Sequence, residues 1–237
     1  MPYFELMGFG PLGWGWYMMS AAGMTLAVSL SALAIGAILG SLAAAAKLSR
    51  SRVAYGIADA YTTVMRGIPD LLVIYLFYFG GSLAITVIAQ RILQSNQFIG
   101  VPSFLTGALA VGVVSGAYQT EVIRAAYLAI YPGEIEAARA FGMSRLLVSR
   151  RIILPQLIRF AIPGMGNVWQ AVLKESALIS VTGLVELLRA AQVGSGSTRQ
   201  PFDFFITAGA IYLVLTAVST WLFHRAESRA SRGVRRA

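Results

Sequence analysis

A few ionisable side chains lie inside or beside long apolar stretches of the sequence. Glu121 follows an uncharged run that begins after Arg91, and Lys174 and Glu175 interrupt another apolar stretch. An ionisable group within a bilayer costs several kcal/mol unless it is paired or hydrated, so such residues are candidate contacts for a charged solute. A carboxylate would face a cationic group of the solute, and an ammonium would face an anionic one. Structural ion pairs, Glu121 with Arg124 or Lys174 with Glu175, are the alternative.

Uncharged polar residues accompany these groups at helical spacing. One stripe carries side chains at i, i+3 and i+7: Asn167, Gln170 and Lys174. Tyr118 precedes Glu121 by about one turn. Arg66 lies near the start of another apolar stretch and is a candidate gate, with packing or lipid contact as the alternative. These residues need helices that cross a membrane to hold them.

The composition favours such helices. The chain has 237 residues, of which 57% are hydrophobic and 12% are charged. Soluble domains carry about 25% charged residues, so this composition indicates an integral membrane protein. The sequence contains no Cys and one His, which excludes disulfides, thiolate metal sites and His-cluster metal sites. A membrane-embedded enzyme is therefore disfavoured, because it would lack a plausible nucleophile–base or metal set.

Hydropathy predicts an all-α polytopic membrane protein with five transmembrane helices. About 20 apolar residues cross the hydrocarbon core, and the predicted spans are 18–46, 68–90, 103–127, 157–182 and 204–224. The aromatic stretch Trp14–Tyr17 is typical of a membrane interface. The start of the chain lacks a basic region before its long apolar stretch, so a cleaved signal peptide is not expected.

Lys and Arg predict the orientation. They concentrate after the first span, between the third and fourth spans, and in the tail that ends with Arg232, Arg235 and Arg236. The basic side faces the cytoplasm, so the N-terminus is expected outside and the C-terminus inside. The net charge of +9 then reflects orientation and contact with anionic membrane lipid. Binding to nucleic acid is not expected.

Small residues predict close helix packing in two places. The motifs Gly36-x-x-x-Gly40 and Gly112-x-x-x-Gly116 place glycines one turn apart, which lets helix backbones approach each other. The segment Gly194–Ser197, with the sequence Gly-Ser-Gly-Ser, predicts a flexible outer loop. Glu186 and Arg189 belong to the same outer region and are expected to be solvated or to contact a partner protein.

The segment at about 131–155 predicts a helix–glycine–helix element on the cytoplasmic side. Pro132-Gly133 ends the third span, and a short helix is expected from about Glu134 to Phe141. Gly142 is expected to end that helix, and Ser144 to cap a second one. The second helix carries four apolar residues: Leu146, Leu147, Ile152 and Ile153. This element is either a docking surface for a partner or an amphipathic hairpin on the membrane.

The same segment resembles the EAA loop of ABC-importer permeases position for position. Glu136-Ala137-Ala138 is followed after three residues by Gly142, and after nine more by Ile152-x-Leu154-Pro155. The resemblance implies that this loop is the coupling helix, which fits a groove on an ATPase subunit. By that resemblance Glu136, Ala137, Ala138 and Gly142 make the contact, and the two alanines provide a small surface that lets the groove close tightly.

Three other segments resemble permeases for polar amino acids, so the resemblance covers nearly the whole chain. They are Tyr61–Pro69, Gly116–Arg124, and Asn167–Gln170 together with Lys174–Ser176. The similarity is to permeases for histidine, for lysine, arginine and ornithine, and for the opines octopine and nopaline, with the opine branch favoured. It implies one permease domain over 1–237 with the type I ABC-importer fold in a bacterial inner membrane.

The resemblance also implies a function and partners. The chain would be the permease subunit of a binding-protein-dependent importer of a polar or basic amino acid or an opine. A second permease subunit, two ATPase subunits and a periplasmic binding protein would complete it. Candidate pathway residues are Glu121, Lys174, Tyr118, Gln170, Asn167, Glu175 and Ser176. A scaffolding or channel-like subunit without its own substrate site is the alternative.

No cofactor is expected in this chain. A phosphate-binding loop of the Gly-x-x-x-x-Gly-Lys-Ser/Thr type needs a glycine directly before its lysine. Lys47 follows Ala46, and Lys174 follows Leu173. ATP and Mg²⁺ would therefore be bound by the separate ATPase subunit.

Overall fold

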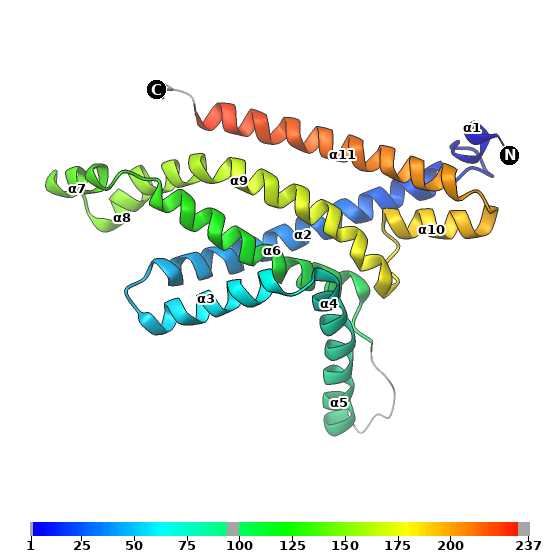
Figure 1. The fold of residues 1–237 in the computed structure, drawn as a ribbon, viewed down its shortest axis with the longest axis horizontal. Coiled ribbons are helices and arrows are strands. Elements are labelled where there is room, and N and C mark those ends of the chain that lie inside the picture. Colours follow the sequence, from blue (N-terminus) through cyan, green and yellow to red (C-terminus); the bar gives the residue numbers. More distant parts are fainter. Residues whose placement is uncertain (1, 94–99, 232–237) are drawn as a thin grey trace.

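The computed structural model describes residues 2–93 and 100–231 of the 237-residue chain, and this part is helical with no strands. Four long helices run along the longest axis of the molecule (Figure 1): α2 (Gly15–Leu48), α6 (Ser103–Leu128), α9 (Leu154–Glu175) and α11 (Pro201–Ala230). The shorter helices are α1 (Tyr3–Leu6), α3 (Arg52–Gly67), α4 (Asp70–Tyr75), α5 (Gly81–Leu93), α7 (Pro132–Ala140), α8 (Arg145–Val148) and α10 (Leu187–Thr198). Two π-helical turns, η1 (Leu76–Gly80) and η2 (Ser149–Ile153), and a 3₁₀ segment, η3 (Ser176–Thr182), join some of them.

Helical segments occupy all five predicted spans, within a few residues of the expected limits. In the described part of the chain, three segments are long and apolar enough to cross a membrane: Gly15–Leu48, Asp70–Arg91 and Pro201–Ala230. Helices α6 and α9 have 26 and 22 residues, about the length that a crossing needs, but are not among these three segments. The all-helical class is confirmed, and the full count of five crossings stays a prediction.

The two glycine motifs pack against each other and bring α2 and α6 into close contact. A Cβ atom on Gly36 would lie 3.1 Å from the carbonyl oxygen of Gly112, and one on Gly40 would lie 3.0 Å from that of Gly116. The predicted packing role is thereby confirmed. Around this contact a buried core forms from α2, α4, α6, α9 and η3, including Val28, Val73, Val111, Val172 and Ile179.

Helix α3 was not predicted as a separate element, and its presence changes the interpretation of the second predicted span. It runs back beside α2 and contacts both α2 and α6. The predicted span 68–90 corresponds to α4, η1 and α5, which leave the bundle sideways in Figure 1. Side chains along α5, such as Leu83 and Ile88, are exposed in the single chain.

The outer end of the molecule differs from the sequence prediction. Gly194–Ser197 lies within helix α10, so the predicted flexible loop is wrong. Gly194 has Phe204 packed against it, since a Cβ there would lie 2.0 Å from the ring, and the Thr198 hydroxyl donates to the Gly194 carbonyl at 2.8 Å. Packing against Phe204 and a side-chain hydrogen bond to the backbone thus accompany a helix whose Gly-Ser composition favours a loop.

Glu186 is also placed differently, because it is fully buried rather than solvated. Its carboxylate caps α10 by accepting from the backbone N–H groups of Leu188 and Arg189 at 2.9 and 2.8 Å. The Tyr212 hydroxyl donates to it at 3.1 Å. Burial raises the pKa of the Glu186 carboxyl, against the effect of these donors. Glu186 therefore joins α10 to α11 inside the protein.

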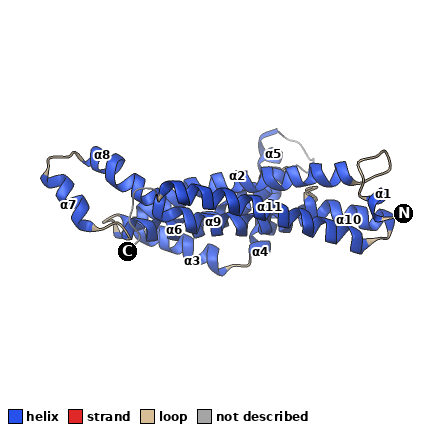
Figure 2. Cartoon of the chain, turned by 90° about the horizontal axis from the view of Figure 1, so that it is seen from above, coloured by secondary structure: helices blue, strands red, loops and turns tan. Residues whose placement is uncertain are grey.

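The two ends of the bundle are distinct. The N-terminus and α10 lie at one end, and α7, α8 and the end of α11 lie at the other (Figure 2). The turn between α2 and α3, which carries Arg50 and is followed by Arg52 at the start of α3, lies toward the same end as α7. Arg232, Arg235 and Arg236 of the predicted basic tail lie outside the described residues.

Candidate functional site

The helix–glycine–helix element forms as the sequence predicts. Helix α7 ends at Ala140, and Gly142 adopts a left-handed conformation with φ of 77°, which favours glycine. The Gly142 N–H donates to the Arg139 carbonyl at 2.9 Å, and the Met143 N–H donates to the Ala138 carbonyl at 3.1 Å. The Ser144 hydroxyl accepts from the Leu147 N–H at 3.4 Å and caps α8. The sharp turn and the cap are confirmed.

The outward face of this element is larger and more apolar than expected. Glu136 and Ala137 are exposed, but Ala138 is only 6% exposed and packs inward. The two alanines therefore do not share one outer surface, because neighbouring helical residues point about 100° apart. Phe141 and Leu146 are 90% and 78% exposed. Phe141 was not singled out from the sequence, although its place directly before the turn glycine is a usable signal.

The element is attached to the bundle at both of its ends. Only three residues separate the end of α6 from the start of α7. On the far side, the Gln156 side-chain amide at the start of α9 donates to the Glu134 carboxylate of α7. A displacement of α7 would therefore act on α6 and α9 together.

A cavity of about 300 Å³ lies between α6 and α9. Its lining residues are Ser115 and Tyr118 from α6, and Asn167, Val168, Ala171, Val172 and Glu175 from α9. The structure thus brings together three of the predicted pathway residues. The predicted gate residue Arg66 lies beside it, with its guanidinium carbon 5.5 Å from the centre of the Tyr118 ring. A cation at this range is attracted to the ring face.

Glu175 has an acidic partner that the sequence did not reveal. Its side chain lies near that of Asp70, the first residue of α4, within range for the two carboxyl groups to interact. Two carboxyl groups this close repel unless a proton or another cation lies between them. The pair is thus a place where the ammonium or guanidinium of a solute could bind.

Lys174 and Gln170 face a second cavity, of about 590 Å³, on the α11 side of α9. Gln170 donates to the Thr220 hydroxyl at 3.1 Å, which links α9 to α11. Ser176 is buried, and its hydroxyl donates to the Leu173 carbonyl at 2.8 Å. Asn167 lines the first cavity, and it also lines a smaller cavity of about 200 Å³ together with Gln170. The predicted stripe therefore continues along α9 from Asn167 through Gln170 to Lys174.

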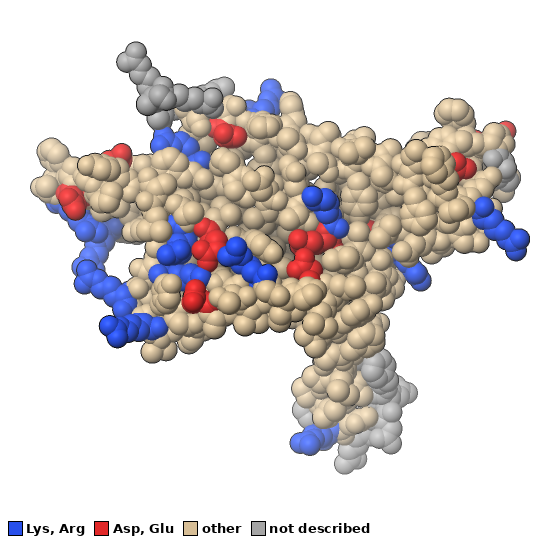
Figure 3. Space-filling view, in the orientation of Figure 1, with Lys and Arg blue, Asp and Glu red and all other residues tan. Residues whose placement is uncertain are grey.

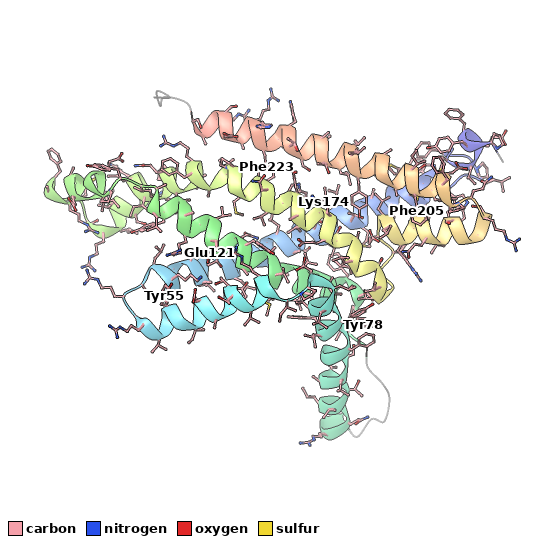
Figure 4. All side chains as sticks on the ribbon, viewed as in Figure 1. Tyr55, Tyr78, Glu121, Lys174, Phe205 and Phe223 are labelled. Atoms are coloured by element: carbon pink, nitrogen blue, oxygen red, sulfur yellow. The ribbon has the colours of Figure 1, made fainter. Side chains whose placement is uncertain are left out.

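Glu121 does not line either cavity. Its carboxylate accepts from the Lys47 ammonium at 2.6 Å and lies 3.6 Å from the Arg124 guanidinium. The ion pair with Arg124, left open by the sequence, is present, but Lys47 of α2 is the nearer partner. Figure 4 places Glu121 nearer the α7 end of the molecule than Lys174. Figure 3 shows acidic and basic atoms interleaved where α3 adjoins α6.

Comparison with known proteins identifies the family of this chain. Residues 36–232 match the family described as binding-protein-dependent transport system inner membrane component. The chain belongs to this family of transport permeases. It is similar to the octopine transport system permease protein OccQ of Rhizobium radiobacter, with 61% identity over 100% of this chain and 99% of that protein.

Other members of the permease family support the same assignment. The histidine/lysine/arginine/ornithine transport system permease protein HisQ of Escherichia coli is 39% identical over 95% of this chain and 98% of that protein. Among solved structures, a chain in the crystal structure of an amino acid ABC transporter with histidines superposes with a TM-score of 0.77. It is 33% identical and covers 91% of this chain and 95% of that one. The permease fold is thus common to sequence and structure relatives.

Proposed function

We propose that this permease carries a polar or basic amino acid or an amino-acid-derived opine across the inner membrane as one subunit of an ABC importer. Its relatives include permeases named for octopine and for histidine, lysine, arginine and ornithine. The observation that carries the substrate class is the Asp70–Glu175 carboxyl pair at the cavity between α6 and α9. A guanidinium or ammonium bound there would form charge-assisted hydrogen bonds with both carboxylates.

The other polar residues have roles that follow from their positions. Tyr118 and Asn167 line the same cavity as Glu175 and would hold the uncharged parts of the substrate. Lys174 and Gln170 would serve a second stage of the path beside α11, where the lysine can face a carboxylate. Arg66, stacked on Tyr118, would move with that ring and gate the first cavity. Glu121 would act on the path through its ion pairs, and Ser176 by positioning the end of α9.

The proposed topology has the N-terminus in the periplasm and the C-terminus in the cytoplasm. It is supported by the termini at opposite ends of the bundle and by the arginines beside α7, α8 and the α2–α3 turn. The proposed passes along the long axis are made by α2, α3, α6, α9 and α11. The apolar arm formed by α4, η1 and α5 lies beside these passes within the membrane.

The energy source is proposed to lie outside this chain. Two ATPase subunits would each receive one α7 element, with Glu136, Ala137, Phe141 and the turn at Gly142 as the contact. ATP and Mg²⁺ would bind to those subunits, and a periplasmic binding protein would deliver substrate to the α10 end. A second permease subunit, identical or homologous, would complete the pathway.

Transport in proteoliposomes tests this proposal. Proteoliposomes that contain the full complex should import radiolabelled arginine or octopine when the binding protein is on one side of the membrane and ATP is on the side of the ATPase subunits. Glu175→Gln and Asp70→Asn should each lower the rate about 10-fold or more, because a charge-assisted hydrogen bond contributes about 1.5–3 kcal/mol. The matched control Glu5→Gln, at an exposed N-terminal carboxylate, should leave the rate unchanged. Absence of uptake across an amino-acid and opine panel would overturn the proposal.

A further inference from the structure

A buried lysine joins three helices near the α7 end of the bundle. Lys47 lies in the last turn of α2, and its side chain is 5% exposed. Its ammonium donates to Asp59 of α3 at 2.9 Å and to Glu121 of α6 at 2.6 Å. Arg124 lies 3.6 Å from the second Glu121 oxygen. These four residues, here called the Lys47 cluster, balance two positive and two negative charges.

Stability alone is a weak reason for such a cluster. A buried ion pair gains little or nothing over apolar packing, because both charges lose their hydration. Helices α2 and α6 are already held by their glycine motifs, which bring the backbones of Gly36 and Gly112 together. The contact that depends on Lys47 is therefore the one that joins α3 to this pair.

Helix α3 is loosely packed in other respects. An open apolar groove of about 400 Å³ lies between it and α2, with Leu42 and Ala46 on one side and Ile57 and Ala58 on the other. Helix α3 buries only Ala58 and Thr62, so few packing contacts oppose its movement. Besides the Lys47 cluster, the Tyr61 hydroxyl ties α3 to α6 by donating to the Val113 carbonyl at 2.6 Å.

Both carboxylates of the cluster lie on segments that lead to functional elements. From Glu121, α6 continues for about two turns to Leu128, and α7 begins at Pro132. From Asp59, α3 continues to Gly67, and the chain then reaches Asp70 of the carboxyl pair. Lys47 is thus the point where the segment leading to α7 meets the segment leading to the cavity.

We propose that Lys47 is a positioning residue for transport, which makes α3 and Asp70 follow the movement of α6 when α7 is displaced by the ATPase. This inference rests on the proposed function. When the cluster is intact, a shift of the cytoplasmic end of α6 pulls Lys47 and Asp59 with it. The Asp70–Glu175 pair then changes its spacing, so that the cavity responds to the state of the ATPase.

Removal of the charge on Asp59, the α3 residue of the Lys47 cluster, gives the sharpest test. Asp59 is 49% exposed, so Asp59→Asn should leave folding and assembly intact while it weakens the bond to Lys47. In proteoliposomes with the full complex and radiolabelled arginine or octopine, the amount imported per ATP hydrolysed should fall at least 3-fold. Lys47→Arg, which keeps a cation, should retain most of this ratio. Arg52→Gln, which removes an exposed charge of α3 outside the Lys47 cluster, is the matched control and should stay near wild type.

A purely structural role would give a different pattern. Loss of assembled complex would lower uptake and ATP hydrolysis in proportion, and their ratio would not change. Such an unchanged ratio in Asp59→Asn overturns the inference. Glu121→Gln supplies a second variant, and the double variant should be no worse than either single change, because both break the same link. Additive losses would also overturn it. If the wild-type complex shows no ATP-driven uptake, the proposed function fails instead.

Discussion

Replacement of Phe141 by alanine should weaken ATPase binding without destabilising the permease. The ring is 90% exposed in the single chain, so its removal should change the free energy of unfolding by no more than about 0.5 kcal/mol. In a docked complex a phenylalanine can bury about 150–250 Å². At about 25 cal/mol per Å² the gross gain is about 4–6 kcal/mol, and ordering costs reduce it. We therefore expect a loss of about 2 kcal/mol, or roughly 30-fold in Kd.

Val148 offers the matched control within the same element. It is 2% exposed, so Val148→Ala should lower the stability of the permease by about 1–2 kcal/mol and affect ATPase binding less. Thermal unfolding and the binding of purified ATPase to permease in nanodiscs measure the two quantities. A docking role for Phe141 is ruled out if Phe141→Ala destabilises the permease as much as Val148→Ala does, or if the Kd for the ATPase does not change.

Three further predictions concern packing, capping and the cavity. Gly112→Val should lower the melting temperature of the permease and its folded yield, because a Cβ there lies 2.8 Å from the Ile35 side chain and 3.1 Å from the Ala32 carbonyl; an unchanged melting curve would contradict the α2–α6 contact. Glu186→Ala should cost about 1–3 kcal/mol by leaving buried donors unsatisfied. The raised pKa of Glu186 means that protonation favours the folded state. Glu186→Gln, which mimics the protonated form, should therefore lower the free energy of unfolding at pH 7 less than Glu186→Ala does. Equal losses of stability in the two variants would count against the cap. Asn167→Leu should lower the uptake rate while ATP hydrolysis continues, and normal uptake would remove Asn167 from the cavity's function.

The sequence could predict features that depend on local patterns. Long apolar runs predicted the positions of α2, α6 and α11, because a membrane helix needs its apolar residues in one continuous stretch. Gly142 and Ser144 predicted the turn and cap of the α7–α8 element, since the backbone conformation and capping bond involve residues only a few positions apart. The glycine motifs likewise predicted the close α2–α6 contact.

Features that depend on distant residues were missed. Lys47 and Glu121 are 74 positions apart, and Asp70 and Glu175 lie on helices whose proximity no local pattern reveals. Helix α3 buries only Ala58 and Thr62, so its short amphipathic pattern was masked by the stronger apolar runs on either side. Helix α10 was missed because its Gly-Ser composition favours a loop, and packing against Phe204 overrides that preference.

We propose that α7 couples this permease to a separate ATPase. The most direct measurement compares ATP-driven uptake by the wild-type complex with that of Glu136→Lys, which reverses an exposed charge on α7. We predict that the variant keeps its helical content and its melting temperature but loses ATPase binding and ATP-driven uptake. Full ATP-driven uptake by Glu136→Lys, at wild-type levels of assembled complex, would contradict the account.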